Sequence, residues 1–76
     1  MVKTQNVDTK LLNEAIERSG LQSKFICSKL GVSRQSYNNK RSGRTAFRGS
    51  EVYVMCDLLR LNDEEKTKIF FPEMLG

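Results

Sequence analysis

The stretch from Ser23 to Arg44 constrains the fold of this chain most strongly, because its pattern predicts two short helices joined by a tight turn. It reads SKFICSKLGVSRQSYNNKRSGR. Gly31 can adopt the left-handed conformation that ends a helix, and the side chain of Ser33 can cap the helix that follows. The first helix has an apolar face with i, i+3, i+4 and i+7 spacing, formed by Ser23, Ile26, Cys27 and Leu30.

The second helix of this stretch presents mainly polar side chains. Tyr37 is its main candidate for burial, and we expect its ring in the core with its hydroxyl at the edge. A helix with so little to bury indicates a surface that binds a partner, and these residue types favour the major groove of DNA. The polar residues are Arg34, Gln35, Ser36, Asn38, Asn39, Lys40 and Arg41.

Basic residues are concentrated in the same part of the chain. No acidic residue occurs between Glu17 and Glu51, and after Glu51 the chain becomes mildly acidic, within a net charge of +4. This distribution is typical of one surface that faces a polyanion and a separate supporting or partner surface, although a solvated basic face is the alternative. The basic residues of the interval are Arg18, Lys24, Lys29, Arg34, Lys40, Arg41, Arg44 and Arg48.

The composition argues against several other classes of protein. The 76 residues are enough for one small domain, and no apolar run is long enough to span a membrane. The first residues lack the apolar segment of a secretory signal, so we expect a cytoplasmic protein. Histidine is absent, and Cys27 and Cys56 belong to no CxxC motif. We therefore expect no metal site, no cofactor and no enzymatic activity, and both cysteines as small core residues.

The remaining pattern predicts an all-α fold, a compact bundle of about five short helices. Residues 1–7 read as a flexible polar tail and residues 8–76 as a single domain. The first helix is capped by Asp8, buries Leu11, Leu12, Ala15 and Ile16, and ends at Ser19-Gly20. The next two helices cover about 23–30 and 34–41.

A fourth helix is expected over about 49–60, with Phe47 just ahead of it as a hydrophobic staple. A fifth should open at Asp63, because Asn62 and Glu65 form a capping-box pattern, and it should end before Pro72. Phe70 and Phe71 lie at its end. We expect at least one of them to close the core, and this end is also the candidate contact of a homodimer.

Ser23 to Arg44 resembles the helix-turn-helix of the phage Cro and repressor family. Cys27 matches the small residue of the first motif helix, Gly31 the turn glycine, and Tyr37 the apolar position of the recognition helix. Lys40 stands at a second apolar position of the family, which predicts a recognition helix that packs less deeply. The resemblance covers about residues 8–71 and implies a lambda-repressor-like DNA-binding fold.

The resemblance implies that the recognition helix, about 34–41, enters the major groove of a double-stranded operator. It assigns base contacts to Arg34, Gln35 and Asn39. Arginine pairs well with guanine, and glutamine or asparagine with adenine. Contacts to the DNA backbone are assigned to Ser23, Ser33, Ser36, Asn38, Lys40, Arg41, Arg44 and Arg48.

Two functions follow from this resemblance. The first is a sequence-specific transcriptional regulator of a phage or prophage genetic switch. The second is an antirepressor, because the YNNKRSG run and the DEEKTKIFF ending are similar to small phage modulators of repression from Gram-positive hosts. Such a protein binds the DNA-binding domain of the phage repressor through its helix-turn-helix face. The apolar residues available for that partner are Val54, Leu58, Phe70 and Phe71.

Overall fold

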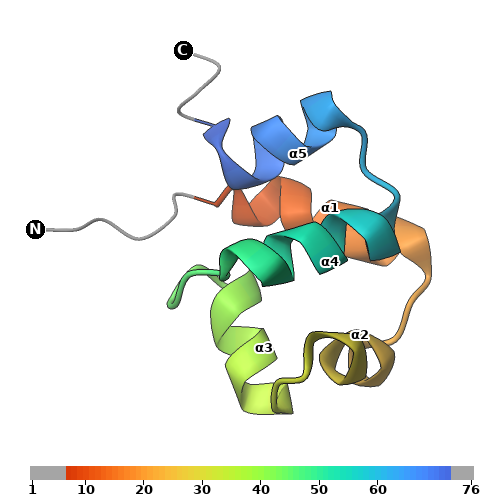
Figure 1. Ribbon diagram of the computed structural model, residues 1–76, viewed down its shortest axis with the longest axis vertical. Helices are drawn as coiled ribbons and strands as arrows, with labels where there is room; N and C mark the ends of the chain where they lie inside the picture. Colours follow the sequence, from red (N-terminus) through yellow and green to blue (C-terminus); the bar gives the residue numbers. More distant parts are fainter. Residues whose placement is uncertain (1–6, 73–76) are drawn as a thin grey trace, which may run out of the picture.

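Five α-helices follow one another in residues 7–72, the part of the chain that the computed structural model describes (Figure 1). No strand occurs among these residues. The predicted all-α class is therefore confirmed, and the predicted helix ranges agree to within about a residue. The helices are α1 (Thr9–Ser19), α2 (Ser23–Leu30), α3 (Arg34–Arg41), α4 (Gly49–Leu59) and α5 (Asp63–Phe70).

The predicted caps of α1 and α5 are present. The Asp8 carboxylate accepts a hydrogen bond from the Leu11 amide at 3.1 Å. At the start of α5, the Asn62 side chain accepts from the Glu65 amide at 2.7 Å, and the Glu65 carboxylate accepts from the Asn62 amide at 3.1 Å. These bonds satisfy amides that have no partner inside the helix, so the local sequence fixes where both helices begin.

Helix α4 ends one residue earlier than predicted, because Arg60 adopts a left-handed conformation with φ of 56°. Its amide donates to the Asp57 carbonyl at 3.3 Å, and the Leu61 amide donates to the Cys56 carbonyl at 2.9 Å. This pair of bonds is the Schellman pattern of a helix end. It turns the chain sharply between α4 and α5.

The helices enclose one core. In Figure 1, α1 and α4 occupy the middle, with α5 on one side and α2 and α3 on the other. Phe47, the residue expected to staple α4, is buried, and its ring meets that of Phe70 edge-on at 5.4 Å. The buried apolar residues are Leu12, Ala15, Ile16, Ile26, Cys27, Tyr37, Phe47, Val52, Met55, Leu59, Ile69 and Phe70.

The beginning and the end of the described chain meet. The Asp8 amide donates to the Ile69 carbonyl at 2.8 Å, and Val7 packs half-buried against the core. Val7 therefore belongs to the domain, not to the tail expected over residues 1–7, whose other members lie outside the described residues. Residues 73–76 lie outside them too. None of the helices between residues 7 and 72 is long and apolar enough to cross a membrane.

Candidate nucleic-acid interface

The turn between α2 and α3 is built around Gly31, which has φ of 74° and ψ of 30°. Its amide donates to the Cys27 carbonyl at 2.8 Å, and the Val32 amide donates to the same carbonyl at 3.2 Å. A side chain at Gly31 would meet nothing within 4 Å, so glycine is needed for the backbone conformation and not for space. Because the turn is this short, it holds α3 at a fixed angle to α2.

Helix α3 begins as predicted. Ser33 accepts a hydrogen bond from the Ser36 amide at 3.0 Å through its hydroxyl. Ser33 precedes α3 and Ser36 lies in its first turn, so both hydroxyls are near the amino-terminal end of the helix. Ser33 is exposed and Ser36 is half-buried. This end is also where an anion would meet the free amides of the helix.

The three residues predicted to contact bases lie on the outer side of α3. Arg34 and Gln35 are exposed, and Asn39 is half-buried one turn after Gln35. Residues four apart on a helix lie one above the other, so Gln35 and Asn39 form a row of two amides. Within residues 7–72, the side chains of Arg34, Gln35, Asn38 and Asn39 form no hydrogen bond and no ion pair.

The expectation that Lys40 contacts a phosphate is wrong. Its side chain lies in the interior with Lys40 only 8% exposed, and its ammonium is 3.1 Å from the carboxylate of Glu51. The same ammonium donates to the Ala46 carbonyl at 3.1 Å. Lys40 thus fills the apolar position of α3 with its methylene stem and neutralises its charge internally. For the same reason the expected shallow packing of α3 is wrong.

Glu51 completes this buried network. It is 7% exposed, and its carboxylate also accepts a hydrogen bond from the Arg48 amide at 2.8 Å, which fixes the start of α4. Burial opposes ionisation of Glu51, but the Arg48 amide and the Lys40 ammonium outweigh it, and its pKa lies below the ordinary value. Because Glu51 is enclosed, the first exposed acidic residue after Glu17 is Asp57. The part of the sequence in which every exposed charged residue is basic therefore extends past Glu51, from Arg18 to the residue before Asp57.

Arg41 has partners within the protein. Its guanidinium lies 5.5 Å from the centre of the Tyr37 ring and donates to the Asn13 side chain at 3.3 Å. The Asn13 amide in turn donates to the Arg41 carbonyl at 3.4 Å. These contacts hold the end of α3 against α1. Arg41 is half-buried, so it retains solvent access for the predicted phosphate contact.

The other residues predicted to contact phosphates lie on α3 or on the elements next to it in the chain. Ser23 is the half-buried first residue of α2, and no side chain caps this helix. Arg44 and Arg48 are exposed on the segment between α3 and α4. The amide of Arg44 donates to the Asn39 carbonyl at 2.9 Å, which fixes the beginning of this segment on α3. Asn38 is exposed on α3 itself.

Tyr37 is completely buried, so the prediction that its hydroxyl reaches the edge of the core is wrong. Among residues 7–72, no group meets this hydroxyl with the geometry of a full hydrogen bond, and the Ser23 side chain is its polar neighbour. Burial raises the pKa of Tyr37, the nearby Arg41 charge opposes this shift, and the Ser23 side chain lies close enough to oppose it as well. A buried hydroxyl without a partner is destabilising.

Replacing Tyr37 with phenylalanine is therefore expected to raise the free energy of unfolding by about 1 kcal/mol, because the ring is kept and the unsatisfied hydroxyl is removed. Urea unfolding of the two proteins followed by circular dichroism measures this change. Tyr53→Phe serves as the control, because Tyr53 is 79% exposed and its hydroxyl can bond to solvent in the folded and the unfolded protein alike. A loss of stability in Tyr37→Phe would show that the hydroxyl has a partner after all.

Two residues near this surface were missed by the sequence analysis. The contact of Asn13 with Arg41 could not be predicted, because a single polar residue on an amphipathic helix normally faces water. Phe25 is 43% exposed on α2, with the Lys29 ammonium 5.5 Å from its ring centre. Its lack of burial follows from the helical period, which places it beside the buried row of Ile26 and Cys27 and not within it.

No group of three or more potential metal ligands occurs among the described residues. In the comparisons with known proteins, no family model, no curated protein and no solved structure matched this chain.

Proposed function

We propose that this protein is a sequence-specific DNA-binding regulator in which α2, the turn and α3 act as a helix-turn-helix. The observation that carries the proposal is the outer side of α3, where Arg34, Gln35 and Asn39 have no intramolecular side-chain partner. These side chains can form bidentate hydrogen bonds with base edges in the major groove. An exposed polar row of this kind contributes little to folding and is free to bind a polar partner.

The surrounding charges support a polyanionic partner. Arg44 and Arg48 lie on the segment after α3, and Lys24 and Lys29 lie on α2, all of them exposed. In the proposed complex, these cations and Arg41 contact phosphates and position α3, whereas the α3 side chains read the sequence. The role is a genetic switch of a phage or prophage in the cytoplasm of a bacterial host. It requires no catalytic group and no cofactor.

The test starts by selecting a preferred duplex from a randomised DNA pool, followed by fluorescence anisotropy at several salt concentrations. We expect Arg34→Ala and Gln35→Ala each to weaken binding to that duplex by about 5- to 150-fold, since each removes a bidentate base contact. Arg48→Ala should weaken selected and unrelated duplexes alike and reduce the salt dependence. Lys68→Ala on α5 is the control and should change neither.

Unchanged affinity in both Arg34→Ala and Gln35→Ala would contradict the assignment of α3 as the reading helix. No preferred duplex, with weak binding to all DNA, would contradict the proposed function as a whole.

The second candidate function is an antirepressor that binds the DNA-binding domain of a phage repressor and blocks its DNA binding. Phe25 favours it, because a large exposed aromatic side chain on α2 suits a protein partner better than a phosphate backbone. Phe70, an apolar residue expected to serve that partner, is only 1% exposed and cannot. Retention of a repressor that is lost in Phe25→Ala, while DNA binding is unchanged, would favour this candidate over the first.

A further inference from the structure

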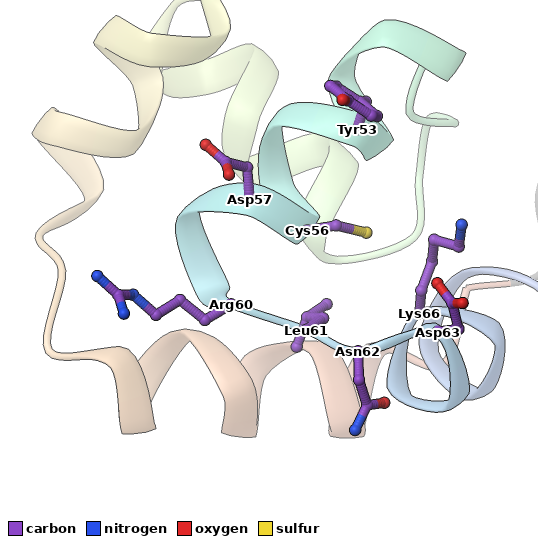
Figure 2. Close-up of a pocket in the computed structure, with 8 residues that line it drawn as sticks. All are labelled: Tyr53, Cys56, Asp57, Arg60, Leu61, Asn62, Asp63 and Lys66. Atoms are coloured by element: carbon purple, nitrogen blue, oxygen red, sulfur yellow. The ribbon is translucent and has the colours of Figure 1, made fainter.

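Lys40 and Glu51 are the two buried charged residues among residues 7–72, and they form an ion pair. Such a pair is often no more stabilising than apolar residues of similar volume, so folding alone does not account for it. The other charged residues of the described chain are exposed or half-buried. In the groove between the end of α4 and the start of α5, shown in Figure 2, the charged residues form no ion pair within residues 7–72: Asp57, Arg60, Asp63 and Lys66.

The buried pair is bonded to the backbone of the segment between α3 and α4. The Lys40 ammonium donates to the carbonyl of Ala46 at 3.1 Å. The Glu51 carboxylate accepts from the amide of Arg48 at 2.8 Å. Each member of the pair therefore holds one residue of the segment, and apolar residues of the same volume could form neither bond.

The other end of the segment is held by a single carbonyl, that of Asn39. It accepts from the amides of Arg44 at 2.9 Å and Thr45 at 3.3 Å. It also accepts from the Ser42 hydroxyl at 3.1 Å. Residues 42–48 are thus fixed at both ends, although they belong to no helix.

The two exposed arginines of this segment lie near the two ends of α3. Arg48 lines a hollow of about 270 Å³ together with Ser36, which is in the first turn of α3. Arg44 lines a second hollow, of about 320 Å³, together with Asn39 near the end of the helix. The bonds that fix the segment therefore also fix a cationic side chain near each end of the proposed reading helix.

We propose that Lys40 and Glu51 are positioning residues, which order residues 42–48 so that Arg44 and Arg48 are already in place when DNA binds. This role rests on the proposed function, in which both arginines contact phosphates. A segment that is ordered before binding avoids the loss of conformational freedom that binding would otherwise impose. Lys40 thus acts on DNA binding through the backbone of the segment, without a phosphate contact of its own.

The double substitution Lys40→Met with Glu51→Leu tests this role, because it removes the pair and leaves the net charge at +4. We expect the variant to remain folded, since apolar residues replace both charges. It should bind the selected duplex and unrelated duplexes alike at least about tenfold more weakly, because the segment must then be ordered on binding. Fluorescence anisotropy measures the affinities, and circular dichroism checks the fold.

A substitution at Arg48 provides a measurement that a purely structural role would not affect. Arg48→Ala removes a positioned contact from the unmodified protein, but only a weakened contact from the double variant. It should therefore reduce DNA affinity by a smaller factor in the double variant. The control is Glu64→Ala with Lys68→Ala, which removes an exposed ion pair from α5, also keeps the net charge, and should change no affinity.

The ordering of the segment can be measured without DNA. Nuclear magnetic resonance of the free protein should give backbone order parameters of about 0.85 for Arg44, Thr45 and Arg48. In the double variant these values should fall below about 0.6, the range of flexible chain.

A second variant, Lys40→Met with Glu51→Gln, replaces the first if that one does not fold. The glutamine oxygen can still accept from the Arg48 amide, so α4 keeps its start and only the bond to Ala46 is lost. The order parameters and the DNA affinity should again fall, by less than expected for the apolar variant.

Unchanged order parameters would overturn the proposal, as would full DNA affinity in a folded variant whose segment has become flexible. An equal effect of Arg48→Ala in both backgrounds would overturn it too. If the order parameters fall as expected but the unmodified protein binds no preferred duplex, the proposed function fails and the ordering role of the pair stands.

Discussion

Replacing Glu51 with alanine is expected to destabilise the protein by about 3–5 kcal/mol, because the buried Lys40 ammonium would lose its carboxylate. The amide of Arg48 would also lose its acceptor at the start of α4. A domain of this size has a total stability of only about 3–5 kcal/mol, so much of the variant should be unfolded at 37 °C. Thermal unfolding followed by circular dichroism measures the effect.

Two control variants separate the buried charge from the loss of a carboxylate. Glu64 pairs with Lys68 at 3.4 Å in an exposed position, so Glu64→Ala should change stability by less than about 1 kcal/mol. The double substitution Lys40→Met with Glu51→Leu removes both charges and should cost much less than Glu51→Ala. Equal losses in Glu51→Ala and Glu64→Ala would contradict the burial of the ion pair.

The ion pair also predicts how stability depends on pH. The pKa of Glu51 is lower in the folded protein than its ordinary value of 4.5. Its contribution is therefore complete above that value and is lost as the pH falls through the lower folded pKa. Below about pH 4.5, Glu51→Gln should lose less stability with acidification than the unmodified protein does.

Replacing Phe70 with alanine is the second change expected to have a large effect, about 3–5 kcal/mol. Its ring is 1% exposed and lies 5.4 Å from that of Phe47, so the substitution leaves a cavity where α5 covers the core. Shortening the chain after Lys68 should lower the melting temperature for the same reason. Differential scanning calorimetry gives the melting temperatures.

Phe71 provides the matched control. It is half-buried beyond the end of α5, so Phe71→Ala should destabilise the protein by less than Phe70→Ala does. Sedimentation of both variants tests the earlier expectation that this end forms a dimer contact. A loss of dimer mass without a change in melting temperature would assign the end of α5 to association.

Local signals in the sequence were sufficient to predict the helices. Asp8, Asn62 and Gly31 each act within a few residues of their own position, and the structure confirms all three as helix ends. The apolar stripe of α1 was predictable in the same way, because helical periodicity decides which side is buried. The row of Gln35 and Asn39 follows from the same periodicity.

The errors concern contacts between distant parts of the chain. Lys40 was predicted to contact the DNA backbone, although a lysine at an apolar position of a helix is buried only beside a carboxylate. Glu51, the next acidic residue in the sequence, supplies that carboxylate. The contact between Asn13 and Arg41 joins α1 to α3, and no periodic pattern in the sequence predicts it. The unsatisfied hydroxyl of Tyr37 depends on packing around it, which local pattern does not encode.

The hydrogen bond between the Asp8 amide and the Ile69 carbonyl has a consequence for unfolding. It joins the residue that caps α1 to the last turn of α5, so α5 cannot detach without exposing the start of α1. The two helices should therefore open as one cooperative unit, although they lie at opposite ends of the chain. In native-state hydrogen exchange, the amide of Asp8 should then exchange at the rate of the amides in α5 and not at that of a fraying end.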